Sequence, residues 1–242
     1  MLSASQLMVV MLLEVLKWQK SMCAVCVINV NTVSKNNARD NKRLVLGCGA
    51  LVYDLTRLIK QNHALSEKVE LQCLPARWHN EPQLIAPAVE KLLSERAHKY
   101  KDIYIAYADC GTGGQLDSVI EKYGAKRIGG AHCYEFFAGT ELFYKLNKQE
   151  IGTFYLTDYL VNNFERLVIV GLGLDKHPEL FDVYFSNYKK LVYLAQTENK
   201  QWQKDACKYA KDFGFSYEYR FVGTGELDTV FKGIEFNAVE AK

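Results

Sequence analysis

Short apolar runs alternate with longer amphipathic segments from residue 43 onward. The short runs, bounded by glycines and polar residues, predict buried β-strands, and the segments of helical periodicity predict α-helices. The predicted strands are residues 43–47, 69–74, 103–108, 126–129, 167–170, 191–195 and 217–222. The predicted helices end near residues 61, 99, 123 and 145 in the first part of the chain, and the later ones cover 157–164, a segment opening at 178, and 201–213.

Strict alternation of short apolar strands with helices is typical of parallel sheets covered by helices on both faces. The sequence therefore predicts an α/β fold with two Rossmann-like halves, about residues 43–150 and 151–236, within one α/β region over 43–236. Two separate sheets and one long sheet both fit this pattern.

Residues 1–42 do not follow this alternation. The apolar run Leu7–Leu16 contains Glu14 and follows no basic segment, so it is too short to span a bilayer and is a poor secretory signal. We expect a poorly ordered extension and linker, with a targeting segment, a docking helix or a misplaced translation start as alternatives. The Cys23–Cys26 pair has C-x-x-C spacing but no second pair nearby, and we interpret it as accidental.

Composition limits the function classes. The 242 residues are 49% hydrophobic, which is enough for a substantial core. Because 30 basic and 28 acidic residues leave a net charge of only +2, no nucleic-acid partner is expected, and no membrane span is expected either. The seven cysteines are odd in number and lie mostly at strand ends or in apolar runs, which predicts reduced thiols in a cytoplasmic protein.

Chemically active side chains recur at the carboxyl ends of the predicted strands. In parallel sheets these ends meet at one edge, where ligands bind. We therefore expect one site at this edge, formed from Cys48, His79, Asp109, Cys110, His132, Cys133, Glu135, Asp175 and His177.

Three of these residues, Cys48, Cys110 and Cys133, each follow a different strand. Their thiolates are suited to Zn²⁺ or an iron–sulfur cluster, with His79, His132 or water completing the ligand set. The alternative is that each cysteine is a small buried residue where a strand meets a helix.

The remaining polar residues predict proton transfer. A thiol at a helix start has a lowered pKa, and His132, Cys133 and Glu135 all lie at one helix start. His79 and His177 both precede a Glu-Pro or Pro-Glu helix opening, where each could act as a base or simply cap the helix. Asp109, Glu135 and His177 are the predicted catalytic residues, which would orient ligands or move protons.

The glycine-rich turn after residue 108 is the predicted binding site for the anionic part of a substrate. Its residues are Gly111, Thr112, Gly113 and Gly114. A strand that breaks into glycines and opens a helix leaves N–H groups available to an anion. A tight strand-to-helix turn needs the same glycines, and a purely structural role for them is the alternative.

Several motifs together resemble an uncharacterised bacterial and archaeal family, domain-of-unknown-function family 1638. They are Gly47–Leu51, Leu74–Ala76 with His79-Asn80, Tyr107–Gly114, His132–Glu135, Thr157–Leu160, Gly171–Asp175 with His177-Pro178, and Leu194–Gln196. The resemblance covers about residues 43–226. It implies relatives encoded beside corrinoid-dependent methyltransferases and folate one-carbon enzymes.

Two functional hypotheses follow. The first is a metal- or iron–sulfur-dependent enzyme or accessory protein with a Cys/His site at the strand ends; the resemblance implies methyl transfer and a corrinoid or methyltransferase partner. The second is a metal-free α/β module that binds a small anionic ligand or a methyltransferase partner, in which the cysteines only pack.

Overall fold

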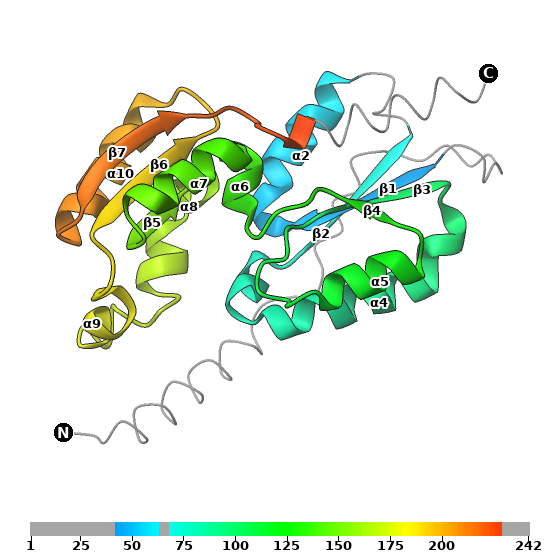
Figure 1. The fold of residues 1–242 in the computed structure, drawn as a ribbon, viewed down its shortest axis with the longest axis horizontal. Helices are drawn as coiled ribbons and strands as arrows, with labels where there is room; N and C mark the ends of the chain where they lie inside the picture. The colour runs from blue at the N-terminus through cyan, green and yellow to red at the C-terminus, as the bar shows by residue number, and fades with distance from the viewer. Residues whose placement is uncertain (1–41, 63–67, 229–242) are drawn as a thin grey trace.

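The protein contains two parallel sheets, one in each half (Figure 1). The structure is a computed structural model that describes residues 42–62 and 68–228. The four-stranded sheet has the order β2-β1-β3-β4 and the three-stranded sheet has the order β5-β6-β7. The predicted α/β class is confirmed, and of the two arrangements that the sequence left open, the described residues form two separate sheets. The predicted extension, apart from Lys42, and residues 229–236 lie outside the described part of the chain.

The first half is built around β1, whose residues are all buried. Helix α2 covers one face of this sheet, and α4 and α5 cover the other (Figure 1). The elements are β1 (Arg43–Cys48), η2 (Gly49–Leu51), α2 (Val52–Gln61), β2 (Val69–Leu74), η3 (Ala76–Asn80), η4 (Pro82–Leu84), α4 (Ile85–Arg96), η5 (Ala97–Lys99), β3 (Asp102–Ala106), α5 (Gln115–Lys122), β4 (Lys126–Arg127) and α6 (Cys133–Ala138).

The second half is built around β6, whose side chains alternate between two cores. Leu191, Tyr193 and Ala195 pack in the core formed with α8, α9 and α10, and Val192 and Leu194 pack in the core formed with α7. This alternation is the period of two that a strand imposes. The elements are α7 (Thr140–Gln149), β5 (Thr153–Leu156), α8 (Asp158–Asn162), the π-helical turn η6 (Glu165–Ile169), α9 (Leu180–Phe185), β6 (Lys190–Ala195), α10 (Lys200–Asp212) and β7 (Ser216–Phe221).

One predicted strand is wrong. Residues 167–170 lie in and after η6, where the Val170 N–H donates to the Glu165 carbonyl at 2.8 Å, and the strand that precedes α8 is β5. A short apolar run does not distinguish a buried strand from a turn of buried helix, which accounts for the error. The helix predicted to end near residue 145 is also divided, because Gly139 has φ +75° between α6 and α7.

The chain passes between the halves at two neighbouring places. Gly139 joins α6, which packs in the first core, to α7, which packs against β6. After β7 the chain returns, Leu227 is fully buried in the first core, and the Glu226 N–H donates to the Phe136 carbonyl at 2.6 Å. A Cβ atom added to Gly139 would lie 3.9 Å from the Glu226 carboxylate, so the two passages are adjacent.

Candidate thiol site

Three thiols and one imidazole meet at the carboxyl edge of the first sheet. Cys110 hydrogen-bonds both His79 and Cys133, and Cys48 lies close enough to interact electrostatically with both cysteines. Each residue comes from a different connection: Cys48 ends β1, His79 lies in η3 after β2, Cys110 follows β3, and Cys133 begins α6. The parallel order of the strands therefore gathers side chains that are far apart in the sequence.

The turn after β3 has an unusual backbone. Cys110 has φ +47° and is the only non-glycine residue with positive φ in the described part of the chain. Its neighbours Gly111, Gly113 and Gly114 also have positive φ, which glycine tolerates and cysteine adopts only at a cost. Strained non-glycine residues of this kind concentrate at functional sites, which makes the Cys110 conformation informative.

Asp109 holds this turn closed. Its carboxylate accepts hydrogen bonds from the Thr112 hydroxyl at 2.7 Å, the Gly114 N–H at 3.0 Å and the Gly113 N–H at 3.2 Å. The Gly114 N–H is the main reason that the pKa of Asp109 lies below its ordinary value. The N–H groups on which the predicted anion site depends therefore already have an acceptor, and an external anion would have to displace Asp109.

The turn is also fixed to the segment before α6. The Asp109 N–H donates to the Gly130 carbonyl at 3.0 Å, and the Cys110 N–H donates to the Ala131 carbonyl at 2.9 Å. Because Ala131 is two residues from Cys133, these two bonds position the Cys110 and Cys133 thiols relative to each other.

The electrostatics make Cys110 the thiolate of the group. The hydrogen bond from Cys133, followed by the hydrogen bond from His79, lowers the pKa of Cys110 far below that of an ordinary thiol, although burial opposes this. The pKa of Cys133 is raised well above its usual value by the same contact and by burial, and the pKa of His79 is raised by its hydrogen bond to Cys110. A thiolate that faces an imidazole and accepts from a second thiol is the arrangement of a nucleophilic cysteine.

Cys48 is held in a different state. Burial raises the pKa of its thiol to about 11, so it stays protonated near neutral pH. The Tyr107 hydroxyl, whose side chain is only 2% exposed, hydrogen-bonds the Cys48 thiol and has no nitrogen or oxygen partner in the described residues. Cys48 and Tyr107 therefore form a buried pair beside Cys110.

Solvent reaches this site from one side. Cys110 is 6% exposed, whereas His79, Gly111 and His132 are exposed. The thiols therefore lie just beneath exposed residues and not deep in the core.

The remaining predicted residues have other contacts. The exposed His132 ring packs against Phe143, with ring centroids 6.4 Å apart. The Glu135 carboxylate accepts from the Ala131 N–H and the Thr140 hydroxyl, both at 3.0 Å.

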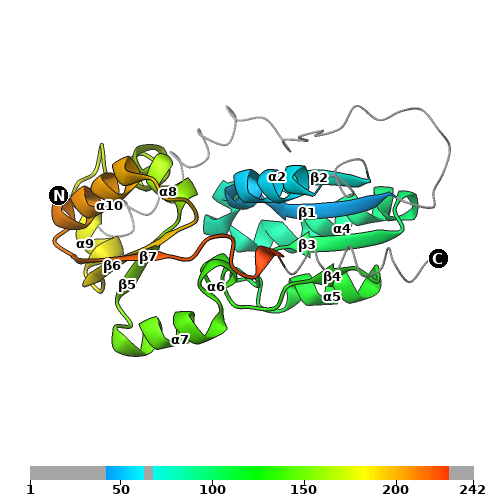
Figure 2. The same cartoon turned by 90° about the horizontal axis from the view of Figure 1, so that it is seen from above.

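His177 lies before α9, with its Nδ1 3.2 Å from the Glu179 carboxylate, and Asp175 is exposed in the preceding turn. Both views place α9 on the side of the second half away from the first sheet (Figures 1 and 2). These two residues do not follow a strand, because the predicted strand before them is helical.

Sequence reasoning missed three tyrosines beside the thiols. Tyr107 lies within the run that was assigned to a strand, Tyr134 interacts electrostatically with all three site cysteines, and Tyr159 reaches Cys48 from the second half. Burial raises the pKa of each, so all three are neutral near neutral pH. The position of Tyr134 directly after Cys133 was the available signal.

No three His, Cys, Asp or Glu side chains within residues 42–62 and 68–228 are arranged to hold a metal ion. Cys48, Cys110, Cys133 and His79 have the right chemistry for such a site, but their side chains would have to move to surround a metal.

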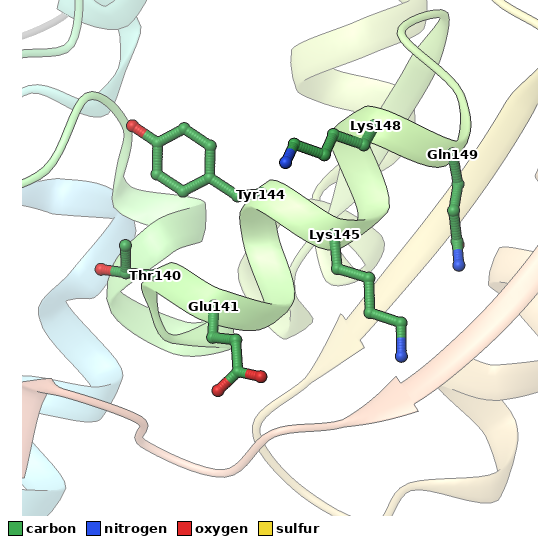
Figure 3. Close-up of a pocket in the computed structure, with 6 residues that line it drawn as sticks. All are labelled: Thr140, Glu141, Tyr144, Lys145, Lys148 and Gln149. Atoms are coloured by element: carbon green, nitrogen blue, oxygen red, sulfur yellow. The ribbon is translucent and has the colours of Figure 1, made fainter.

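Two surface hollows of the described structure lie away from the thiols. One runs along α7, where it is lined by Thr140, Glu141, Tyr144, Lys145, Lys148 and Gln149 (Figure 3). The other runs along α2, lined by Val52, Tyr53, Thr56, Arg57, Lys60 and Gln61. Each is lined by a single helix and contains none of the thiols, so neither coincides with the thiol site.

None of the helices in the described ranges combines the length and the apolar character needed to cross a bilayer.

Comparison with known proteins identifies a family. No curated protein and no solved structure matches this chain. The family model described as "Protein of unknown function (DUF1638)" matches residues 73–231. The match includes His79, Cys110 and Cys133 and begins after Cys48. Because it spans well over half of the sequence, the chain belongs to the DUF1638 family.

Proposed function

We propose that this protein is a thiol-dependent transfer enzyme, or an accessory of one, in which the Cys110 thiolate is the reacting group. The observation that carries the proposal is the contact of the Cys110 sulfur with both His79 and Cys133 in a strained turn. Hydrogen bonding to the charged form of a thiol increases its thiolate fraction at neutral pH, and the thiolate is the nucleophile.

The reaction that suits this arrangement is attack of the thiolate on an electrophilic carbon. A carbon–sulfur bond forms, and the leaving group departs with its electron pair. His79 lies where it can donate a proton to that group, because its ring contacts Cys110 and is also exposed. Tyr107 and the protonated Cys48 would line the buried side of the substrate.

The family resemblance favours a methyl group as the electrophilic carbon that Cys110 attacks. In that case the partner would be a corrinoid or methyltransferase protein, and the reducing conditions of the cytoplasm would keep the thiols free. Free thiols at Cys48, Cys110 and Cys133 support this part of the proposal.

The test is the rate of alkylation by iodoacetamide, measured residue by residue by peptide mass spectrometry between pH 5 and 9. We expect Cys110 to react at the low end of this range, whereas an ordinary thiol reacts only near pH 8.5. His79→Asn should shift the Cys110 profile to higher pH, because the neutral amide cannot stabilise the thiolate charge. The exposed Cys207 provides the internal reference. A Cys110 profile that coincides with that of Cys207 would rule out the proposal.

A metal centre is the second candidate, and one observation favours it: three thiols and an imidazole come from four different strand ends. Such a Cys₃His set is a common Zn²⁺ ligand set, and three cysteines are also a partial set for an iron–sulfur cluster.

Cys48→Ser separates the two candidates. A metal centre needs the Cys48 thiolate, whereas the Cys110 nucleophile does not. Zinc, iron and sulfide should be measured on protein purified without oxygen, with Cys207→Ser as the matched control. Stoichiometric metal that is lost in Cys48→Ser and kept in Cys207→Ser would favour the metal centre. Metal-free protein with unchanged Cys110 reactivity would favour the nucleophile.

A further inference from the structure

We propose that Cys110 and Cys133 form a dithiol pair that exchanges with small disulfides, so that the protein passes reversibly between a dithiol and an internal disulfide. This inference shares the Cys110 nucleophile with the proposed function and adds a second reacting residue and a new substrate class. Its basis is the contact between two free thiols that the backbone holds together.

The geometry favours Cys133 as the partner of Cys110. The bonds from the Asp109 and Cys110 N–H groups to the Gly130 and Ala131 carbonyls fix the two segments, and the Cys133 thiol donates to the Cys110 sulfur. Cys48 interacts with Cys110 only electrostatically and ends β1, where it is paired with Leu74 of β2. Cys133, in contrast, is the first residue of α6, two residues after the Ala131 carbonyl that accepts from the Cys110 N–H.

The two thiols also differ in their contacts, as the two steps of exchange require. Cys110 is hydrogen-bonded by the His79 ring as well as by Cys133, so it is the thiol that His79 assists. The first step of exchange needs a thiolate, and the second needs a nearby protonated thiol that is activated only after the charge on the first has gone.

The reaction balances with a small disulfide as the oxidant. The Cys110 thiolate attacks one sulfur of the small disulfide, a mixed disulfide forms, and one small thiolate leaves. The Cys133 thiol then loses its proton to His79 or to the departing thiolate and attacks the Cys110 sulfur, which releases the second small thiolate. In total, two protein thiols lose two electrons and two protons, and one small disulfide becomes two small thiols.

The pair lies next to the surface. Cys110 is 6% exposed, its contact His79 is exposed, and so are Gly111, Ala131 and His132, which are adjacent in sequence to the two thiols. The elements that carry the pair, the turn after β3 and the start of α6, lie at the same edge of the first sheet.

The experiment is oxidation of the full-length protein with oxidised glutathione, followed by acid quench and peptide mapping of disulfides by mass spectrometry. We expect wild-type protein to form a Cys110–Cys133 disulfide that dithiothreitol reverses. In Cys133→Ser, a glutathione adduct should accumulate on Cys110, because the resolving thiol is absent. In Cys110→Ser, neither product should form at these positions. Cys207→Ser, which changes an exposed thiol outside the site, should behave as wild type.

Each result bears on a different claim. Rapid alkylation of Cys110 without any Cys110–Cys133 disulfide would overturn the dithiol inference and leave the proposed nucleophile standing. A disulfide between Cys110 and Cys48 would also overturn it. Slow alkylation together with no disulfide would reject both proposals. The wild-type mapping does not depend on any variant, so the test holds even if a serine variant fails to fold.

Discussion

The two sheets are both parallel, but they differ in how completely the polar groups at their carboxyl edges are hydrogen-bonded. At the edge of the second sheet, the buried Asp158 carboxylate accepts from the Tyr193 hydroxyl at 2.6 Å, the Thr197 hydroxyl at 2.7 Å and the Gln196 N–H at 3.1 Å. Gln196 in turn accepts from the Asp158 N–H at 2.7 Å and donates to the Leu194 carbonyl at 2.6 Å. Every one of these groups has a partner within the protein.

The edge of the first sheet is left incomplete. The Tyr107 hydroxyl has the Cys48 thiol but no nitrogen or oxygen atom as a partner within the described ranges, the Cys110 backbone is strained, and the exposed His79 ring contacts Cys110. Strained residues of this kind concentrate where a ligand binds or a reaction occurs. The same topology therefore carries a satisfied polar network in one half and, in the function proposed here, a reactive site in the other.

The largest contrast should come from one substitution at each edge. Asp158→Ala leaves two buried donors and one half-buried donor without an acceptor, and we expect it to lower the free energy of unfolding by about 3 kcal/mol. Cys110→Ser should change it by less than about 1 kcal/mol while abolishing alkylation at residue 110. Urea unfolding monitored by circular dichroism measures the first quantity, and peptide mapping measures the second.

Asp175→Ala is the matched control for the carboxylate, because Asp175 is exposed in a turn of the same half. It should leave the unfolding midpoint unchanged. If Asp158→Ala were as mild as Asp175→Ala, the second edge would not be the structural network that its hydrogen bonds indicate.

A smaller effect is expected where the chain returns from the second half to the first. Gly225 has φ +53°, and a Cβ added there would lie 2.2 Å from the Phe136 carbonyl oxygen. Gly225→Ala should therefore destabilise the protein by about 2 kcal/mol, since backbone atoms would have to shift. Gly223, with φ +61°, has nothing within 4 Å of its added Cβ.

Gly223→Ala consequently isolates the cost of backbone conformation alone, about 1 kcal/mol. The difference between the two alanine variants measures the close approach of the returning segment to α6, which carries Cys133. Equal midpoints in urea unfolding would show that this approach is not tight in solution.

The sequence predicts the elements of the first half better than the contacts at its edge. The apolar runs at residues 43–47 and 69–74 and the run before Asp109 correspond to β1, β2 and β3, because strands buried on both faces are nearly continuous in hydrophobicity. The topology then brings Cys48, His79, Cys110 and Cys133 together, although the roles assigned to them stay predictions. The strand predicted at residues 167–170 was wrong because helical and strand segments of this length have the same apolar composition.

The hydrogen bonds of Asp109 and Glu135 were not predictable from the pattern. Whether a carboxylate closes its own turn or faces a ligand depends on the φ angles of the next few residues, and several glycines permit both outcomes. The unequal acidity of Cys110 and Cys133 likewise depends on which thiol faces His79, which spacing along the chain does not reveal.

A pH-dependent effect is expected at the contact between the two halves. Asp54 on α2 is buried, and this burial, together with the charge of Asp158 across the interface, raises the pKa of its carboxyl to about 6, despite the opposing charge of Arg57. The rings of Tyr53 and Tyr159 meet at the same interface, with centroids 6.4 Å apart. An acid whose pKa is higher in the folded state than in the unfolded state stabilises folding when protonated. That stabilisation is present below the unfolded-state value of about 4 and is lost as the pH rises to about 6.

Asp54→Asn removes this titration, so the difference in free energy of unfolding between wild type and variant should change with pH. Between pH 4 and pH 6, wild type should lose on the order of 2 kcal/mol relative to Asp54→Asn, with no further change above pH 7. Asp117→Asn provides a control of opposite sign, because the ion pair with Arg127 lowers the pKa of Asp117, and wild type should gain stability relative to that variant as the pH rises. Parallel pH curves for wild type and Asp54→Asn would mean that Asp54 is hydrated in solution and that the two halves separate more readily than their contact at Tyr53 and Tyr159 indicates.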